Sequence, residues 1–306
     1  MYQSKAKLEL KSAIFFITHP IYILFIIIEI KSETFKKEKN TVITQENINS
    51  FIERIPPAPE ALRATLHHLQ MQDLTKAAHT AKEDKALSAY LKELVNKPIF
   101  GFRSEVSDVS QIFGILGVAR SQQAVYNYMV TLLSPSKWLL FKLNKSSFYN
   151  LQAELTVNWQ KILKHLAIND KEIESAITLL PASIIVSEAL FCTKIDDVNL
   201  LRSVNAIDLN TILQRLCGMD LFDISERIGV KWEMQERIMQ IVQAASGIKP
   251  PAQSEINLLG KWMHLLLFFT LSKGVYVDAG LNDFIEFQID FVADIYEEFA
   301  TLMEIA

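Results

Sequence analysis

The chain has 306 residues, of which 50% are hydrophobic, and its formal net charge is −4 at pH 7. This composition supports a large buried core and excludes a predominantly disordered protein. The slightly acidic balance also argues against nucleic-acid binding, which requires a clustered basic face. The two cysteines, Cys192 and Cys217, form no Cys-x-x-Cys pair. We expect both to be buried free thiols in a reducing compartment.

An uncharged apolar run, residues 13–28, lies near the amino terminus with lysines on both sides. A membrane-spanning helix needs about 20 apolar residues, so this run is slightly short, and Pro20 would kink it. Three interpretations stay open: a membrane anchor through residues 13–30, a helix packed on the body or on a partner, and an extension created by an early start site. We assign residues 1–45 to this hydrophobic segment and its polar linker.

The body, residues 46–250, carries apolar residues at helical spacing and shows no sustained strand alternation. Residues 48–55 predict a first helix. Pro59 suits the first position of the next helix, and Asp73 suits the N-cap of the helix after that. Residues 86–95 carry a two-row apolar stripe, which is typical of a helix packed on a core.

Two glycines interrupt the next helical region. Gly101 lies in an aromatic loop, residues 96–103, between two predicted helices. Gly117 suits a left-handed stop after a helix over residues 106–116. Ser121 can cap a further helix beyond that stop.

Helical spacing continues to the end of the chain. Residues 150–166 and 171–190 predict two helices, the second interrupted by Pro181. After the double proline at 250–251, residues 256–271 predict a very apolar helix.

The last predicted helix, residues 282–303, combines phenylalanines at helical spacing with acidic residues. We expect it to close the core, and the alternative is a helix that docks in a groove or forms a dimer. We assign residues 251–306 to a C-terminal helical extension packed on the domain.

Four short motifs occur in a fixed order. Residues 55–59 read Ile-Pro-Pro-Ala-Pro, 84–87 read Asp-Lys-Ala-Leu, 96–101 read Asn-Lys-Pro-Ile-Phe-Gly, and 111–118 read Gln-Ile-Phe-Gly-Ile-Leu-Gly-Val. Their order and spacing resemble the HDOD domain, a bacterial signalling module related to HD-type phosphohydrolases. Lys85 stands where that family usually has proline, and Gln111 where it has alanine. A later turn around Trp232 also resembles the family. The residues that carry the resemblance are Pro56, Pro59, Asp84, Leu87, Asn96, Gly101, Leu116, Gly117 and Trp232.

The resemblance covers roughly residues 47–245 and implies an all-α, multi-helix HD-like bundle, here with extra C-terminal helices. Catalytic HD-type relatives bind metal through a His…His-Asp…Asp set, and the metal activates water for phosphoester hydrolysis. In this chain no histidine is followed by aspartate. The stretch that corresponds to the His-Asp pair offers no imidazole or carboxylate; it consists of Leu180, Pro181, Ala182 and Ser183. We therefore predict no catalytic, cofactor-binding or metal-binding residues, and no enzyme.

The histidines offer no replacement set. His67 and His68 are neighbours, which point about 100° apart on a helix, and we expect them at the surface. His79 and Glu83 have the spacing of a surface pair. We expect His264, in its apolar helix, to be a hydrogen-bonded core or interface residue.

A lysine-rich stretch, residues 137–148, alternates Lys137, Lys142 and Lys145 with aromatic residues. We expect it to be a solvated helix edge, and the alternative is a surface for nucleic acid or a membrane.

The sequence thus predicts a non-catalytic signalling or regulatory HDOD module that acts through protein or ligand contacts. One alternative is a metal-independent sensor of a small molecule or nucleotide, which would keep the old pocket as a ligand cavity. The second alternative is a residual HD-type phosphohydrolase. We expect no cofactor, a cytoplasmic location, protein partners in bacterial signalling and no nucleic acid. A dimer and an inner-membrane tether through residues 13–30 stay open.

Overall fold

The computed structural model divides the chain into two units, Met1–Val42 and Ile43–Ala306. The structure describes residues 43–53, 59–98, 101–102, 104–192, 194–205, 208–232, 234–248, 254–282 and 284–305. The interpretations of the N-terminal apolar run therefore lie outside the described residues.

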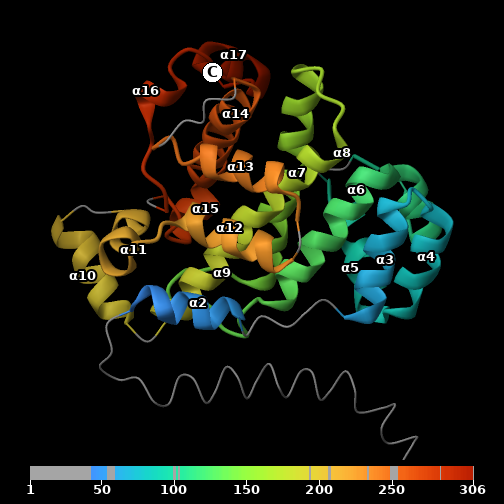
Figure 1. The fold of residues 1–306 in the computed structure, drawn as a ribbon, viewed down its shortest axis with the longest axis horizontal. Coiled ribbons are helices and arrows are strands. Elements are labelled where there is room, and N and C mark those ends of the chain that lie inside the picture. The colour runs from blue at the N-terminus through green and yellow to red at the C-terminus, as the bar shows by residue number, and fades with distance from the viewer. Residues whose placement is uncertain are drawn as a thin grey trace, which may run out of the picture. The chain divides into compact units, whose positions relative to one another are not determined.

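All regular secondary structure in the described ranges is helical, which confirms the predicted all-α class (Figure 1). The elements are α2 (Gln45–Glu53), α3 (Glu60–Gln70), α4 (Leu74–Glu83), α5 (Lys85–Val95), α6 (Val109–Leu132), α7 (Lys145–His165), α8 (Lys171–Ser175), the 3-10 helix η2 (Ala176–Thr178), α9 (Leu179–Phe191), α10 (Ile195–Asn205), α11 (Leu209–Cys217), α12 (Leu221–Lys231), α13 (Glu236–Ala244), α14 (Ser254–Leu271), α15 (Gly274–Asp278), α16 (Ile289–Val292) and α17 (Tyr296–Met303).

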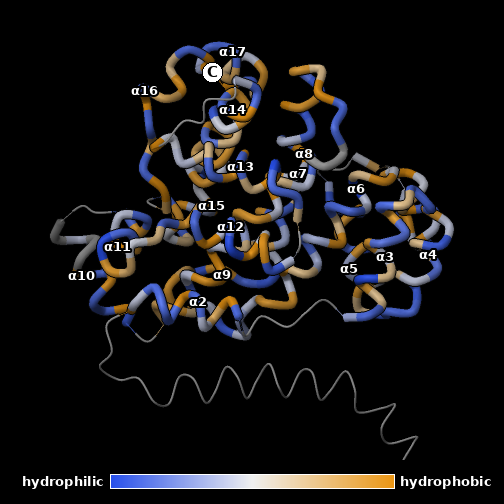
Figure 2. Tube along the Cα trace, in the orientation of Figure 1, coloured by the Kyte–Doolittle hydropathy of each residue, from blue (hydrophilic) through white to orange (hydrophobic). Residues whose placement is uncertain are grey.

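The helices of the second unit form two groups. Helices α3, α4 and α5 pack against α6, while α7, α9, α12, α13 and α14 form the larger group (Figure 1). Helix α2 comes first among the described helices but packs on α9 and α12, where Lys231 Nζ lies 3.0 Å from Glu53 Oε2. Apolar residues concentrate where the helices meet, most visibly along α9 and α14 (Figure 2).

Acidic or amide side chains begin many of these helices. Asp73 Oδ1 accepts a hydrogen bond from the backbone amide of Lys76 at 2.9 Å, as the sequence predicted. Such caps satisfy amide groups that lack partners within the helix. Side-chain caps of this kind occur at Asp73, Asp84, Asp108, Asn144, Asp208 and Asp220.

Helix α6 is interrupted at the predicted stop, Gly117. This glycine has φ 72° and ψ 179°. The positive φ favours glycine, but the ψ is not that of the left-handed helix. The expected interruption by a glycine with positive φ is therefore confirmed, while its extended ψ differs from the expected left-handed conformation: two helical segments meet at a kink at Gly117, and the second runs to Leu132. Ser121 is fully buried and its hydroxyl has no partner among the described residues, so it does not act as the predicted cap.

The predicted helix over residues 171–190 is three shorter elements, α8, η2 and α9. Pro181 lies in the first turn of α9. Proline has no amide hydrogen and its ring crowds the preceding turn, which is tolerated at the start of a helix but not inside one. The stretch Ile173–Phe191 is long and apolar enough to span a membrane, but 83% of its most apolar window is buried inside the bundle. We interpret it as a central core segment.

The C-terminal extension differs most from expectation. Helix α14 has bounds close to the predicted range, residues 256–271. It packs against α13 and α7. The predicted helix over residues 282–303 is not continuous: α16 has four residues and α17 eight, and the segment before α16 is irregular. Phe284 and Ile285 in that segment are buried, so tertiary packing overrides the local helical periodicity.

Candidate functional site

The motif residues near the start of the domain cap and anchor helices. Asp84 Oδ1 accepts hydrogen bonds from the backbone amides of Ala86 at 2.9 Å and Leu87 at 3.0 Å. Leu87 is fully buried behind this cap. Pro59 is the N-cap residue of α3, one position before the predicted one, and Pro56 lies outside the described residues.

Asn96 closes the loop that follows α5. Its Nδ2 donates to the carbonyl of Val106, and its Oδ1 accepts from the amide of Val106, both at 2.9 Å. The same Nδ2 donates to the carbonyl of Lys92 at 2.8 Å. Gly101, within the closed loop, has a φ of 71°, which glycine adopts without strain. Asn96 therefore holds the two ends of this loop together.

The later motif residues shape α6 and α12. Leu116 is buried just before the kink at Gly117. Trp232 ends α12, where its amide donates to the carbonyl of Ile228 at 3.0 Å, and its half-buried ring packs against the core. Each described motif residue thus has a structural role as a cap, a loop closure, a kink or a packing contact.

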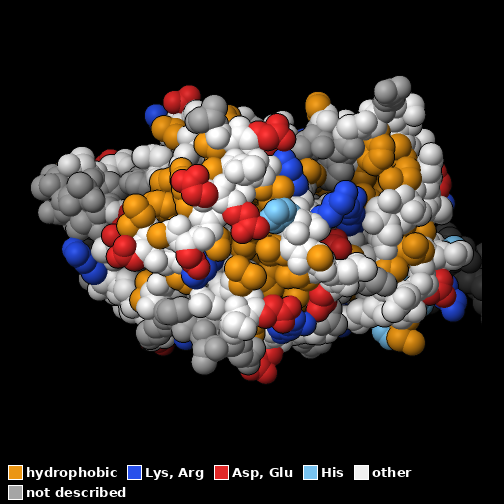
Figure 3. Space-filling model, turned by 90° about the horizontal axis from the view of Figure 1, so that it is seen from above, with side chains coloured by type: hydrophobic (Ala, Val, Ile, Leu, Met, Phe, Trp, Pro, Cys, Tyr) orange, Lys and Arg blue, Asp and Glu red, His pale blue; other side chains and the backbone are white. Residues whose placement is uncertain are grey.

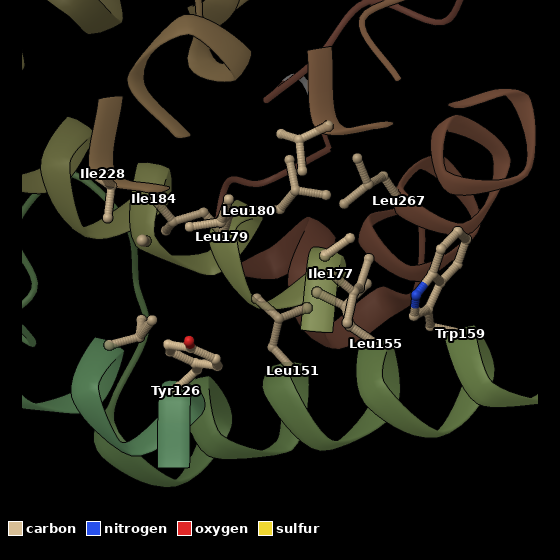
Figure 4. Packing of buried hydrophobic residues seen from close by; sticks show 14 of the residues in the cluster. Tyr126, Leu151, Leu155, Trp159, Ile177, Leu179, Leu180, Ile184, Ile228 and Leu267 are labelled. Atoms are coloured by element: carbon tan, nitrogen blue, oxygen red, sulfur yellow. The ribbon is translucent and has the colours of Figure 1, made fainter. Parts of the chain in front are cut away.

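The stretch in place of the His-Asp pair lies in the core. Leu180, Pro181, Ala182 and Ser183 are all buried in α9. The Ser183 hydroxyl donates to the carbonyl of Leu180 at 2.7 Å and is used within the helix. Figure 4 shows Leu179 and Leu180 among apolar side chains from other helices, including Leu155, Ile228 and Leu267.

The space beside this stretch is almost completely filled. Leu180 and Pro181 line a cavity of about 10 Å³, together with apolar side chains from α7, α9, α12 and α14 and the segment before α16. A cavity needs about 10–15 Å³ to hold a single water molecule. The predicted alternative of a retained ligand pocket therefore has no cavity of adequate size at this position.

The described histidines are spread over four helices, and only His67 and His68 share one. His67 and His68 are on α3, His79 is on α4 and His165 is on α7, while His19 lies outside the described residues. His79 Nδ1 lies 3.6 Å from Glu83 Oε1, and both side chains are exposed, as expected for a surface pair. Among the described residues, no group of three His, Cys, Asp or Glu side chains could hold a metal ion.

His264 is fully buried, and both ring nitrogens are engaged. Nδ1 lies 2.8 Å from the carbonyl oxygen of Ala245, and Nε2 accepts a hydrogen bond from the amide of Gln288 at 3.0 Å. Burial lowers the pKa of His264 below its usual value. This confirms the interpretation of a hydrogen-bonded core histidine, which has no free nitrogen for a ligand.

The cysteines are free thiols. Cys217 is buried, and burial raises the pKa of its thiol to about 11. Cys192 is half-buried, which corrects the expectation that both would be buried. A thiol with a raised pKa is a poor nucleophile at neutral pH, so Cys217 is a packing residue.

The lysine-rich stretch does not form the predicted helix edge. Lys137 and Lys142 lie in an irregular segment, and Lys145 begins α7. Phe141 and Phe148 are fully buried. Because these aromatic rings face the core, they offer no stacking surface for nucleic acid.

Glu188 is a buried ionisable residue that sequence reasoning missed. Its Oε1 accepts hydrogen bonds from the amides of Leu139 and Leu140, and its Oε2 accepts from Leu140 and Phe141, at 2.5–3.1 Å. The carboxylate therefore fixes the segment before α7 onto α9. The available signal was a lone acid in an otherwise apolar helix, because such a group is rarely fully buried unless its charge is satisfied.

Comparison with known proteins places this geometry in a family. The sequence profile of the HDOD domain matches residues 55–247. The fold is similar to an HDOD domain protein of unknown function from Geobacter sulfurreducens, with a TM-score of 0.59 and 14% identity over 85% of this chain and 95% of that one. It is also similar to a protein from Shewanella amazonensis SB2B provisionally described as a phosphohydrolase, with a TM-score of 0.55 and 16% identity over 84% and 97% of the two chains. No curated protein sequence matches the chain.

Proposed function

This chain belongs to the HDOD domain family, and from that premise we propose that it is a non-catalytic regulatory module that acts through contacts with other proteins. The observation that carries the proposal is the burial of residues 180–183 in the apolar core. A catalytic relative needs metal ligands at this position, and here the side chains are buried in apolar surroundings. Hydrolysis by the metal-dependent mechanism would need ligands from elsewhere.

The absence of a sizeable cavity at this position also favours protein contacts over ligand sensing. Small-molecule pockets usually enclose about 300–1,000 Å³, whereas the cavity beside Leu180 measures about 10 Å³. A nucleotide could enter only if the helices whose side chains line this cavity, α7, α9, α12 and α14, moved apart. The sensor alternative therefore requires a rearrangement, while the interaction module does not.

The first test measures the metal content of the purified chain and its phosphodiester hydrolysis. We expect the purified full chain to hold substoichiometric transition metal, and to hydrolyse neither a generic phosphodiester nor cyclic dinucleotides when Mn²⁺ or Fe²⁺ is added. One equivalent of metal retained through dialysis, together with phosphodiester turnover, would reject the proposal in favour of a residual phosphohydrolase.

A thermal-shift screen separates the interaction module from the sensor. A ligand present at 100 times its Kd stabilises the folded state by about 2.7 kcal/mol, which would raise the Tm of a chain of this size by several degrees. We expect no such increase with nucleotides or cyclic dinucleotides. A saturable, concentration-dependent increase in Tm would establish the sensor instead.

The proposed location is the cytoplasm. The two free cysteines support a reducing compartment. Carbonate extraction of cells that express the full chain tests this location and decides on the N-terminal apolar run. Recovery in the soluble fraction supports the proposal, and retention in the membrane pellet would assign residues 13–30 to an anchor.

A further inference from the structure

The C-terminal segment is the most one-sided in charge. From Ala279 onward the sequence contains seven acidic residues and no lysine, arginine or histidine. Because the formal net charge of the whole chain is −4, the part before Ala279 is slightly basic. The acidic residues of this segment are Asp283, Glu286, Asp290, Asp294, Glu297, Glu298 and Glu304. Such a concentration of one sign creates a local negative potential at the surface.

The inner side of this segment is firmly held. Phe284, Val292 and Phe299 are buried in the core. Lys261 Nζ lies 2.6 Å from Asp294 Oδ2, and His165 Nε2 lies 2.6 Å from Glu298 Oε1. The segment is therefore a fixed part of the fold, and its outer side presents a preorganised surface.

The outer side carries two exposed isoleucines close together. Ile289 on α16 is 64% exposed and Ile248 is 57% exposed. A Cβ built on Gly247 would lie 2.9 Å from Phe291 Cδ1 and 3.0 Å from Gln288 Cβ. Since Ile248 follows Gly247 and Ile289 follows Gln288, the two isoleucines share one part of the surface. Single exposed apolar residues are common, whereas neighbouring exposed apolar residues indicate an interaction site more strongly.

Exposed acidic residues lie near Ile289 along the chain. Asp290 is next to Ile289, and Glu286 and Glu297 lie on either side along the chain. All three are exposed and have no ion-pair partner among the residues that the structure describes. Figure 3 shows acidic and hydrophobic side chains interspersed on the face seen from above.

The charge of this surface selects the kind of partner. Nucleic acids and anionic membranes would be repelled. A second copy bound through the same face would place acidic groups against acidic groups, because a two-fold interface is self-complementary. A basic amphipathic helix matches both the exposed isoleucines and the acidic charge. Its apolar side can cover the isoleucines while its lysines and arginines pair with the carboxylates.

We propose that Ile248, Ile289, Glu286, Asp290 and Glu297 form an acidic docking face that binds a basic amphipathic segment of a partner protein. The inference rests on the proposed function, since it names the chemistry of the partner. It concerns a surface that lies beyond the 55–247 region matched by the family profile.

The test uses the full chain and a labelled peptide of about 18 residues, with leucines at helical spacing and lysines elsewhere. Binding is measured by fluorescence anisotropy at low and high salt. Ile289→Ser removes apolar contact and should weaken binding roughly tenfold. The double variant Asp290→Lys/Glu297→Lys should weaken it at least about tenfold and reduce the salt dependence.

Matched controls lie far along the chain from this surface. Leu200→Ser replaces an apolar side chain that is 61% exposed on α10, and Glu105→Lys reverses an exposed acid that has no ion pair among the described residues. Both should change affinity less than about twofold, because they lie outside the docking face. Circular dichroism and Tm verify that every variant is folded.

Two results would overturn the inference. One is equal binding of a scrambled peptide with the same composition but no apolar side, which would indicate unspecific charge attraction. The other is an equal loss of affinity in the control variants. Either result, in a protein that hydrolyses nothing, rejects this surface and leaves the regulatory module standing. Metal-dependent turnover with selective peptide binding rejects the non-catalytic module and leaves the surface standing.

Discussion

The imidazole of His264 accepts a hydrogen bond from the backbone amide of Gln288, with 3.0 Å between Nε2 and the amide nitrogen. Because Nε2 accepts, Nδ1 carries the proton and donates to the carbonyl of Ala245, 2.8 Å away. The neutral ring thus joins the end of α13 to the irregular segment before α16. This link holds the C-terminal extension on the domain.

Replacing this histidine should destabilise the protein. His264→Phe keeps an aromatic ring but leaves the amide of Gln288 and the carbonyl of Ala245 without partners. Each buried unsatisfied group costs about 1–3 kcal/mol, so we expect the free energy of unfolding to fall by roughly 2–4 kcal/mol in urea titrations. His79→Ala is the control: this exposed histidine forms only a surface pair, and its loss should change stability by less than about 0.5 kcal/mol. A small effect at His264 would contradict its linking role.

Stability should also depend on pH through His264. Burial lowers the pKa of this histidine in the folded state, while the unfolded chain binds the proton near pH 6.5. Below about pH 6.5 the unfolded state therefore binds more protons, and the free energy of unfolding falls as the pH falls until the folded-state pKa is reached. The measurement is urea unfolding from pH 7.5 to 5. The decrease should be steeper in the wild type than in His264→Phe, and equal slopes would refute the assignment.

Asp220 should change the pH dependence of stability in the direction opposite to that of His264. Burial raises the pKa of this N-cap carboxyl to about 6, even though amides of α12 donate to its Oδ1. Between about pH 4 and 6 the folded state binds more protons, so Asp220 contributes a loss of stability as the pH rises. Asp220→Asn keeps the Oδ1 acceptor and removes the charge. We expect it to raise the free energy of unfolding at pH 7 by roughly 1–3 kcal/mol, and an advantage that persists unchanged at pH 3.5 would contradict this cause.

Glu188→Gln tests the carboxylate that binds the segment before α7. Glutamine has one acceptor oxygen, and its amide group would face amide donors of residues 139–141. We expect a loss of roughly 2–4 kcal/mol and faster hydrogen exchange at those amides. Glu93→Gln is the control, because Glu93 is exposed and lies 3.9 Å from Lys97. Unchanged exchange at residues 139–141 would show that the carboxylate is dispensable.

Gly260→Ala tests the close approach of α14 to α13. The new Cβ would lie 2.6 Å from Ala244 Cβ and 2.8 Å from its carbonyl carbon. The helices must separate, and overpacking of this kind costs typically about 1–3 kcal/mol, occasionally more. The matched control is Gly114→Ala in α6, where nothing lies within 4 Å of the new Cβ. There alanine should stabilise by roughly 0.5–1 kcal/mol, and equal effects at both sites would reject the proposed crossing.

The motif positions differ in how far sequence could explain them. The cap at Asp84 was predictable in kind, because its acceptor and donors lie within three residues. The pairing of Asn96 with Val106 spans ten residues, and spacing alone contained no signal for it. Glu188 was missed because its partners lie 47–49 residues earlier in the chain. A buried carboxylate needs partners, but only the packing of α9 identifies them.

The sequence by itself determined the all-helical class, the cap at Asp73, the missing His-Asp pair at residues 180–183 and the acidic charge of the C-terminal segment. These properties depend on residue identity and on contacts within about one helical turn. The tertiary structure decided that this stretch lies in a nearly closed apolar core, that residues 282–303 form no single helix, and that Gly247, which precedes Ile248, lies against Gln288, which precedes Ile289. These outcomes depend on contacts between residues far apart in sequence, whose packing and long-range hydrogen bonds outweigh local propensity.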